Sequence, residues 1–405
     1  MSTLVRIGLK RIVSNNIFQH NKNLPFMRTI TSLRTRSPDE DRPEKPKPWP
    51  YNDKPFTLFH YLYDKTSARL DENSKIVVVE GPVAAGKSKL AKALAQEFDM
   101  LYLPEANLDM IYINDYGYDL RKLDPQLPDS CKSWDVMDFL KNPRHRHTIR
   151  FQLQQYIIKY SQYIDALAHV LSTGQGVVLD RCVYSDFVFT EAMYHSGFLN
   201  KQCRKRYYEF RDNSISELLR PHLIIYLDVP VPKVMENIQK RAISYEKDSK
   251  VLTPKYLSTM EKYYKQEYLK TMSKHSELLI YDWSEEGDVE IVVEDIERID
   301  FNRFDTQDTQ LKDWVCRLEE EYGVLRHKYA DKKHSLMNYF NIPCFDIPEL
   351  EVEAMEAHAY HTLMNNAPGN QFLKGYNAKQ GDTGLLFKTG GPHRETLPLR
   401  ERRTS

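Results

Sequence analysis

Short apolar runs alternate with longer segments of helical spacing along the middle of the chain. Five runs cover residues 76–80, 100–104, 176–180, 223–229 and 278–282. Between them, apolar residues recur at intervals of three and four over residues 87–98, 149–171, 231–242 and 254–272. Strands that are apolar throughout are typical of a parallel sheet covered by helices on both faces. The pattern predicts a three-layer α/β body.

The segments on either side of this body differ from it in composition. Residues 37–56 hold six prolines, which block regular hydrogen bonding and favour an extended connector. After residue 304 the alternation stops, and a charged stretch with helical spacing gives way to irregular sequence. We therefore expect four parts: a targeting segment at 1–36, the Pro-rich connector at 37–56, the α/β domain at 57–304 and a helical or irregular extension at 305–405.

The extension is interpreted as a partner-binding segment, and a disordered tail is the alternative. Aromatic residues are scattered along it, namely Trp314, Tyr322, Tyr339, Phe340, Phe345, Tyr360 and Phe372. Such residues are scarce in segments that remain disordered. We expect them to become buried against another protein.

Charge is balanced over the whole chain but not along it. The first 37 residues contain seven Lys and Arg and no Asp or Glu, and their apolar residues can share a helical stripe. Basic, amphipathic N-terminal segments rich in Ser and Thr are typical of mitochondrial presequences. A basic nucleic-acid-binding arm is the alternative. Without this segment 50 basic and 57 acidic residues remain, a balance that disfavours general nucleic-acid binding.

Other features of the composition exclude several classes of protein. The five cysteines are widely separated and include no C-x-x-C pair, so neither a disulfide framework nor a cysteine-based zinc site is expected. No run approaches the ~18 apolar residues of a membrane-spanning helix. We therefore expect any membrane association to go through a partner.

The first apolar run leads directly into a phosphate-binding motif. Residues 81–88 read G-P-V-A-A-G-K-S and match the P-loop pattern G-x-x-x-x-G-K-S/T between a strand and a helix. In such a loop, backbone N–H groups converge on phosphate oxygens, and the following helix directs its positive end at the same point. We expect Lys87 to contact the β- and γ-phosphates and Ser88 to ligate Mg²⁺. The predicted nucleotide-binding residues are Gly81, Pro82, Val83, Ala84, Ala85, Gly86, Lys87 and Ser88.

Acidic residues follow two other predicted strands. Glu105 comes after the second strand, and Asp180-Arg181 ends the third. Ligands of open parallel sheets bind outside the carboxyl ends of the strands, so these side chains should meet the P-loop. Each carboxylate alone is also compatible with a simple helix cap.

Residues 76–299 resemble the deoxyribonucleoside kinases. In that family a Glu after the second strand is the base toward a sugar hydroxyl, a Phe-Gln pair on a long helix binds the nucleobase, and an acidic residue followed by Arg positions the acceptor and phosphates. Glu105, Phe151-Gln152 and Asp180-Arg181 match these positions. The resemblance implies a five-stranded parallel sheet of order 2-3-1-4-5. Without it, Phe151 and Gln152 would read as a core aromatic residue beside a solvated amide.

The match to this family is incomplete in the lid that closes over the phosphates. Several arginines are expected after the fourth strand, but only Arg241 fits, and Gln239 and Ile243 occupy positions where others are expected. The Trp that usually follows the catalytic Glu is also missing after Glu105. One such arginine can contribute ~10³-fold or more to phosphoryl transfer. The sequence therefore favours nucleotide binding over turnover.

The presequence, the kinase-like body, the reduced lid and the long extension together resemble the kinase-like accessory subunits of mitochondrial respiratory complex I, NADH:ubiquinone oxidoreductase. This resemblance implies binding to other subunits of the membrane arm, on the matrix side of the inner membrane, without a transmembrane span and without a part in electron transfer. It also carries an association with FAD, although the chain has no G-x-G-x-x-G dinucleotide motif.

Three functions remain open at the level of sequence. The first is an accessory subunit without activity of its own, which holds a nucleotide (ATP or a deoxynucleotide, with Mg²⁺) in a kinase-like pocket. The second is an active mitochondrial deoxynucleoside kinase in which Glu105 is the catalytic base. The third is a free nucleotide-responsive regulator.

Overall fold

The computed structural model describes residues 29–35, 45–301 and 309–385. Its centre is a five-stranded parallel sheet in the order β2-β3-β1-β4-β5. The strands are β1 (Ile76–Glu80), β2 (Leu101–Leu103), β3 (Val177–Asp180), β4 (Leu223–Asp228) and β5 (Glu277–Asp282). Each begins and ends within one residue of an apolar run, so the predicted sheet and its order are confirmed.

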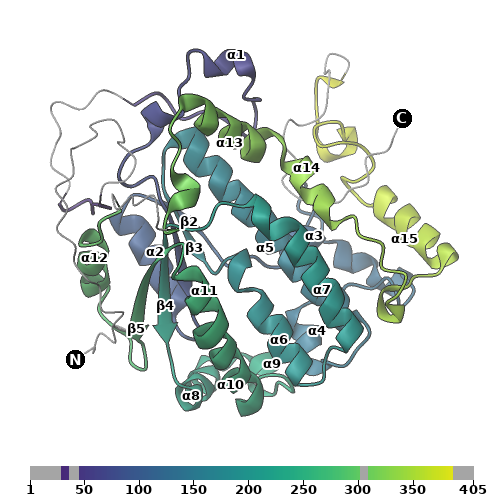
Figure 1. Cartoon of the computed structure of the whole chain (residues 1–405). Coiled ribbons are helices and arrows are strands. Elements are labelled where there is room, and N and C mark those ends of the chain that lie inside the picture. Colours follow the sequence, from purple (N-terminus) through teal and green to yellow (C-terminus); the bar gives the residue numbers. More distant parts are fainter. Residues whose placement is uncertain (1–28, 36–44, 302–308, 386–405) are drawn as a thin grey trace.

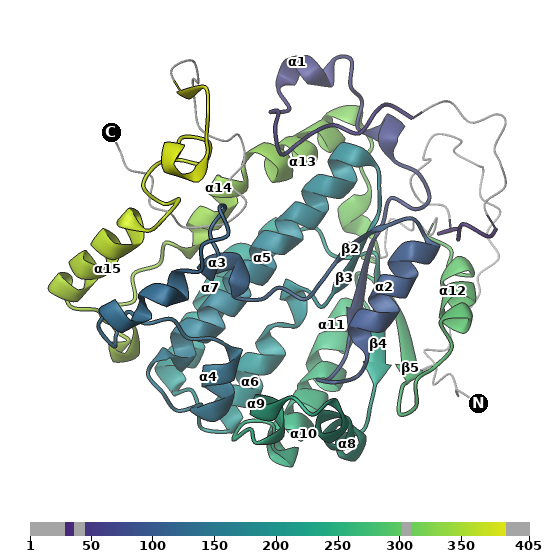
Figure 2. The ribbon, with the colours of Figure 1, turned by 180° about the vertical axis from the view of Figure 1, so that it is seen from behind.

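Helices cover both faces of this sheet (Figures 1 and 2). On one face lies α2 (Lys87–Glu97), with α12 (Val289–Glu297) packed beside it. On the other face lie the long α5 (His147–Thr173) and α11 (Leu269–Met272). The remaining helices of the body are α3 (Asp109–Tyr112), α4 (Val136–Lys141), α6 (Phe187–His195), α7 (Lys201–Ser214), α8 (Val231–Arg241), α9 (Ser244–Lys247) and α10 (Pro254–Tyr263). The three-layer α/β prediction is therefore confirmed.

A short segment ahead of the Pro-rich connector packs on the body. Ile30 is fully buried in the main core, and the backbone N–H of Thr31 donates to Asn73 Oδ1 at 2.9 Å. The next N–H, of Ser32, donates to Glu297 Oε1 at 2.8 Å. Residues 29–35 thus behave as part of the fold. The rest of the predicted targeting segment lies outside the described residues.

The connector and the start of the extension hold each other in place. Helices α1 (Leu58–Tyr61) and α13 (Glu319–Asp331) lie together at the top of Figure 1, and α13 packs along α5. The guanidinium of the fully buried Arg326 lies 3.8 Å from the ring centre of Phe56 and 5.4 Å from that of Trp49. Its Nη2 donates to Asp64 Oδ2 at 2.9 Å. A buried, paired arginine of this kind fixes two distant parts of the chain together.

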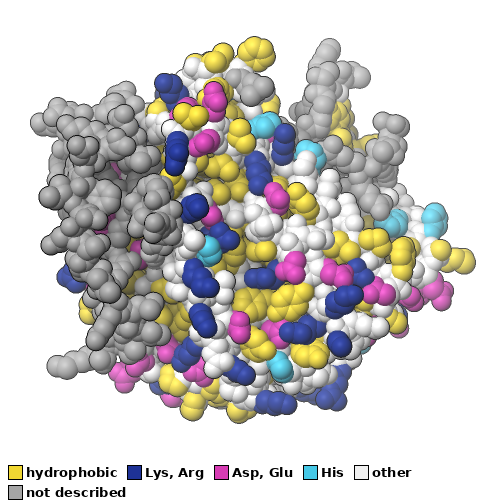
Figure 3. Space-filling model, viewed as in Figure 1, with side chains coloured by type: hydrophobic (Ala, Val, Ile, Leu, Met, Phe, Trp, Pro, Cys, Tyr) yellow, Lys and Arg dark blue, Asp and Glu magenta, His cyan; other side chains and the backbone are white. Residues whose placement is uncertain are grey.

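The aromatic residues of the extension divide into two groups. Trp314, Tyr322 and Phe340 are buried within this chain, so the expectation that they contact another protein is wrong for these three. Phe340 packs against aromatic rings of α5 and α7, and Trp314 packs against His222, the residue before β4. By contrast, Phe345 and Phe372 are 87% and 56% exposed. Figure 3 shows exposed apolar side chains at the right end of the molecule, over α15 (Ala354–Asn366), which follows α14 (Lys333–Met337).

Candidate nucleotide-binding site

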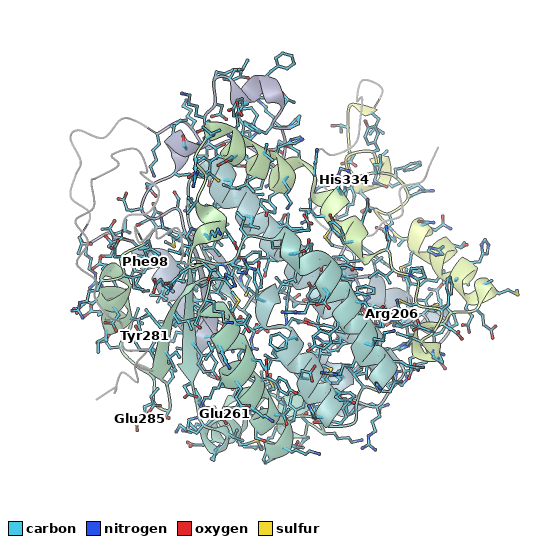
Figure 4. The ribbon with its side chains drawn as sticks, viewed as in Figure 1. Phe98, Arg206, Glu261, Tyr281, Glu285 and His334 are labelled. Atoms are coloured by element: carbon cyan, nitrogen blue, oxygen red, sulfur yellow. The ribbon has the colours of Figure 1, made fainter. Side chains whose placement is uncertain are left out.

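The carboxyl ends of the strands lie at the lower edge of the molecule, the side on which Glu261 of α10 and Glu285 of the loop after β5 are seen (Figure 4). A cavity of about 680 Å³ lies beside these strand ends. Its walls come from the P-loop, α5, the end of α8, α9 and the start of α10. This volume is in the range of small-molecule sites.

The P-loop has the backbone conformation that phosphate binding requires. Gly81 has φ +149°, and a Cβ there would lie 2.8 Å from the carbonyl oxygen of Leu227 on β4. Gly86, with φ +81°, turns the chain directly into α2, whose first residue is Lys87. Both glycines are needed because other side chains strain or clash in these positions. The positive end of α2 therefore points at the cavity.

Two loop side chains and one strand-end carboxylate gather at the mouth of the P-loop. Lys87 Nζ donates to Pro82 O at 2.8 Å, and Ser88 Oγ donates to Asp180 Oδ2. The other oxygen of this carboxylate, Oδ1, is buried and has no hydrogen-bond partner within the described residues. Mg²⁺ in kinase sites is held by one or two such oxygens together with phosphates. Ser88 and Asp180 thus fit a Mg²⁺ ion that arrives with a nucleotide.

Glu105 and Arg181 form an ion pair in the wall of the cavity. The distance from Arg181 Nε to Glu105 Oε1 is 3.3 Å. Burial disfavours the charged carboxylate, but the positive charges of Arg181 and Lys87 outweigh burial and hold the pKa of Glu105 below its usual value. Glu105 is therefore ionised at neutral pH and could accept a proton from a hydroxyl group.

The predicted nucleobase residues line the same cavity. Phe151 is buried and stacks on Phe139, with ring centres 5.1 Å apart. Gln152 is 1% exposed, so it is not the solvated amide of the alternative interpretation, and its Nε2 donates to Asp186 Oδ2 at 2.8 Å. The amide Oε1 remains as an acceptor toward a base.

Four further residues near the cavity are not among those predicted from the sequence: Asp186, Tyr207, Lys159 and Phe189. Asp186 is fully buried and accepts a hydrogen bond from the hydroxyl of Tyr207 at 2.8 Å. It also forms an ion pair with Lys159, whose Nζ lies 2.6 Å from Asp186 Oδ1. The ammonium of Lys159 also lies 4.8 Å from the ring centre of Phe189. The sequence signal for this cluster is Lys159, which lies two helical turns after Gln152 on the buried side of a long helix. An unpaired charge would be costly there, so this lysine indicates a buried acidic partner.

The lid segment, residues 239–250, presents few cations to the cavity. Arg241 Nη2 lies 3.4 Å from Glu246 Oε1, and Lys240 pairs with Glu236 on its own helix. Gln239 and Ile243 are not among the residues that line the cavity. The lid cations that reach the cavity are thus already paired with carboxylates of the chain. Helix α8 itself is held to the P-loop by Asn237 Nδ2, which donates to Ala84 O at 3.1 Å.

The described residues give no support to other kinds of site. Among the described strands only β1 is followed by a glycine-rich turn, and its spacing is that of a P-loop, so the chain does not fit the dinucleotide mode of FAD binding. In the same parts of the chain, His, Cys, Asp and Glu form no group of three able to hold a metal ion. None of the described helices combines the length and apolar character needed to cross a membrane.

A parallel sheet of this strand order, with a P-loop on its middle strand and an acceptor pocket beside it, defines a nucleoside-kinase type of P-loop protein. Residues 77–318, more than half of the chain, match the deoxynucleoside kinase family model. The chain therefore belongs to the deoxynucleoside kinase family.

The relatives with the highest identity described here are not named as kinases. The chain is 38% identical over 329 residues to the Mus musculus protein "NADH dehydrogenase (ubiquinone) 1 alpha subcomplex subunit 10, mitochondrial". The aligned residues cover 81% of this chain and 88% of the mouse protein. The Bos taurus protein of the same name is 36% identical over 333 residues, covering 82% and 92%. A deoxyguanosine kinase of Dictyostelium discoideum is 29% identical over 238 residues, covering 58% and 73%.

Proposed function

We propose that this chain is a non-catalytic accessory subunit of mitochondrial NADH:ubiquinone oxidoreductase that holds a nucleotide in its kinase-like cavity. The similarity to the mammalian subunits carries this proposal. It extends over 329 residues, well beyond the part that matches the kinase family model. If this chain shared only nucleotide binding with the mammalian subunits, we would expect the similarity to be confined to the kinase domain.

The proposal that the nucleotide is held and not turned over is supported by the difference between the P-loop side and the lid side of the cavity. The P-loop, Lys87 and the Ser88–Asp180 pair provide what phosphate and Mg²⁺ binding need. The lid segment, with Arg241 paired to Glu246, provides little to stabilise a phosphoryl group in transfer. We propose ATP or a deoxynucleotide with Mg²⁺ as the ligand, and no flavin.

We propose that the chain acts on the matrix side of the inner membrane, bound to other subunits of the membrane arm. Electrophoresis of gently solubilised mitochondria under native conditions tests this. The chain should migrate with NADH dehydrogenase activity at high mass. Migration only as a free chain of low mass would reject the subunit function and favour a soluble nucleotide-responsive regulator.

The presequence is proposed to end earlier than residue 36. Residues 29–35 contribute the buried Ile30 and several backbone hydrogen bonds to the fold, and their removal would expose part of the core. We place the processing site before Thr29. Mass spectrometry of the N-terminal peptide from isolated mitochondria should find Ile30 retained, and a mature chain that begins after Ile30 would contradict this placement.

An active deoxynucleoside kinase is the second candidate, because Glu105 lies in the cavity as an ionised carboxylate beside Arg181. Transfer of label from radioactive ATP to the four deoxynucleosides tests it. We expect no transfer above the blank. Transfer that Glu105→Gln and Lys87→Ala abolish would instead establish the kinase.

A further inference from the structure

A buried group of side chains lies beneath the P-loop and reaches the cavity through Arg181. Glu80, the last residue of β1 and the neighbour of Gly81, is fully buried. Its Oε1 accepts from the backbone N–H of Cys182 at 3.1 Å, and its Oε2 accepts from the hydroxyl of Tyr264 at 3.2 Å. Carboxylates this deep in a core are rare and need such partners.

The same tyrosine hydroxyl holds the arginine of the site. Arg181 Nη1 donates to Tyr264 OH at 3.1 Å, while Arg181 Nε faces Glu105 at 3.3 Å. The residues Glu80, Tyr264, Arg181 and Glu105 therefore form one continuous polar chain, which we call the Arg181 support. It runs from the buried end of the central strand to the open cavity.

Arg181 needs this support because its own backbone is strained. Its φ is +65°, in the left-handed region that non-glycine residues rarely occupy. Its N–H donates to Val79 O at 3.0 Å, so the peptide is fixed to β1. A side chain that starts from a strained backbone in a buried position has few orientations available, and its hydrogen bonds select among them.

The helix that carries Tyr264 is irregular at that point. Between α10 and α11, residues Tyr264–Tyr268 form a π-helical turn, and such turns are frequent at functional sites. The turn places Tyr264 among Glu80, Arg181 and the ring of Tyr226, whose centre is 5.5 Å away. Helix α10, which ends directly before this turn, carries Tyr256, which lines the cavity, so one continuous helical segment contacts both the cavity and the support.

We infer that Tyr264 and Glu80 are positioning residues that aim the Arg181 guanidinium at Glu105 and the bound nucleotide. This inference rests on the proposed function. Burial favours the neutral form of Glu80, and the charge of Arg181 favours the ionised one. The positioning itself stands on the hydrogen-bond geometry, in which one hydroxyl group joins the carboxylate to the guanidinium.

The test compares Tyr264→Phe with Tyr268→Phe in the purified full-length chain. Both substitutions remove one buried hydroxyl from the same π-helical turn, but that of Tyr268 lies 3.9 Å from Cys182 Sγ and makes no bond to Arg181. Calorimetric titration with Mg²⁺ and a panel of ATP and the four deoxynucleoside triphosphates gives the affinity. Tyr264→Phe should weaken the tightest binder about tenfold, the effect of one lost charge-assisted hydrogen bond, and Tyr268→Phe should leave it within about twofold.

A thermal melt and a crystal structure of the ligand-free Tyr264→Phe chain complete the test. Equal loss of affinity in both variants, in step with equal loss of melting temperature, would overturn the inference in favour of a purely structural role. If the unsubstituted chain binds none of the five nucleotides, the proposed function fails, and the crystal structure then decides the inference alone. Arg181 displaced from Glu105 supports it, and Arg181 unmoved overturns it.

Discussion

The P-loop and the lid segment face the same cavity, yet they differ in how they would bind phosphate. The P-loop presents backbone N–H groups, the N-terminal end of α2 and the buried Lys87, and it directly follows the central strand β1. The lid segment presents Arg241, whose side chain is half exposed and already paired with Glu246. Phosphate binding would thus depend on the P-loop side of the cavity, and phosphoryl transfer would depend on the lid side.

If the proposed function holds, this difference explains how a kinase fold would keep nucleotide binding while it loses turnover. Binding needs a preformed cradle, whereas transfer needs cations that reach the phosphoryl group only in the transition state. Under the proposed function, residues 81–88 meet the requirement for binding, and residues 239–250 do not meet the requirement for transfer.

The largest expected effect comes from Lys87→Ala on the P-loop side. Removal of this buried ammonium should weaken nucleotide binding about 100-fold, since charge-assisted hydrogen bonds contribute ~1.5–3 kcal/mol each. Calorimetric titration measures the affinity. Lys92→Ala, an exposed lysine on the same helix, is the matched control and should bind as the unsubstituted chain does. Equal effects of both substitutions would show that the P-loop is not the phosphate site.

The pH dependence of binding should also follow the P-loop. Burial, and then the charge of Arg181, lowers the pKa of Lys87 from 10.5 to about 8. In the ligand-free chain without Mg²⁺ the ammonium is present below this pKa and is lost as pH rises through it. Affinity should therefore be flat below about pH 7 and fall about tenfold between pH 8 and pH 9.5. A flat profile to pH 9.5 would mean that the Lys87 ammonium does not carry the binding.

Removal of Mg²⁺ should weaken nucleotide binding about as much as the rise in pH does, or less. Chelation of Mg²⁺ should weaken nucleotide binding about tenfold in the unsubstituted chain, because Ser88 and Asp180 fit its ligands. Ser88→Ala should bind more weakly and lose most of this dependence. A Ser88→Ala chain that still responds fully to Mg²⁺ would place the ion elsewhere.

The fold and the P-loop could be predicted from the sequence because their signals are local in the chain, whereas Glu105, Phe151-Gln152 and Asp180-Arg181 were predicted from the strand ends and the family resemblance. The five strands are continuous apolar runs, and residues 81–88 form one unbroken motif. For the Lys159–Asp186 pair the sequence signals only that a buried lysine needs a partner, and the Arg181 support is not visible at all, since each joins different elements of the fold. Tyr264 in particular depends on a π-helical turn that helical spacing does not indicate.

For the extension, too, the sequence does not indicate which residues pack together in the fold. Aromatic residues predict burial but not the surface that buries them. Trp314 packs against His222, with ring centres 4.1 Å apart, inside the same chain, whereas Phe345 remains exposed. The partner of an aromatic side chain is a tertiary property and becomes visible only in the folded structure.

The smallest expected effect comes from the lid. Arg241→Ala should weaken nucleotide binding threefold or less, a change of about 0.6 kcal/mol, because an exposed guanidinium paired with Glu246 gains little from the ligand. Lys247→Ala, an exposed residue of α9, is its control. A loss as large as that of Lys87→Ala would erase the contrast between the two sides of the cavity.

The nucleotide content of the native assembly tests the central claim most directly. NADH:ubiquinone oxidoreductase that contains this chain would be purified from mitochondria without added nucleotide and denatured in acid, and the released nucleotides would be quantified by mass spectrometry. The account predicts about one nucleotide per chain, retained through purification in accordance with a tight complex. An assembly that contains the chain but releases no stoichiometric nucleotide would contradict it.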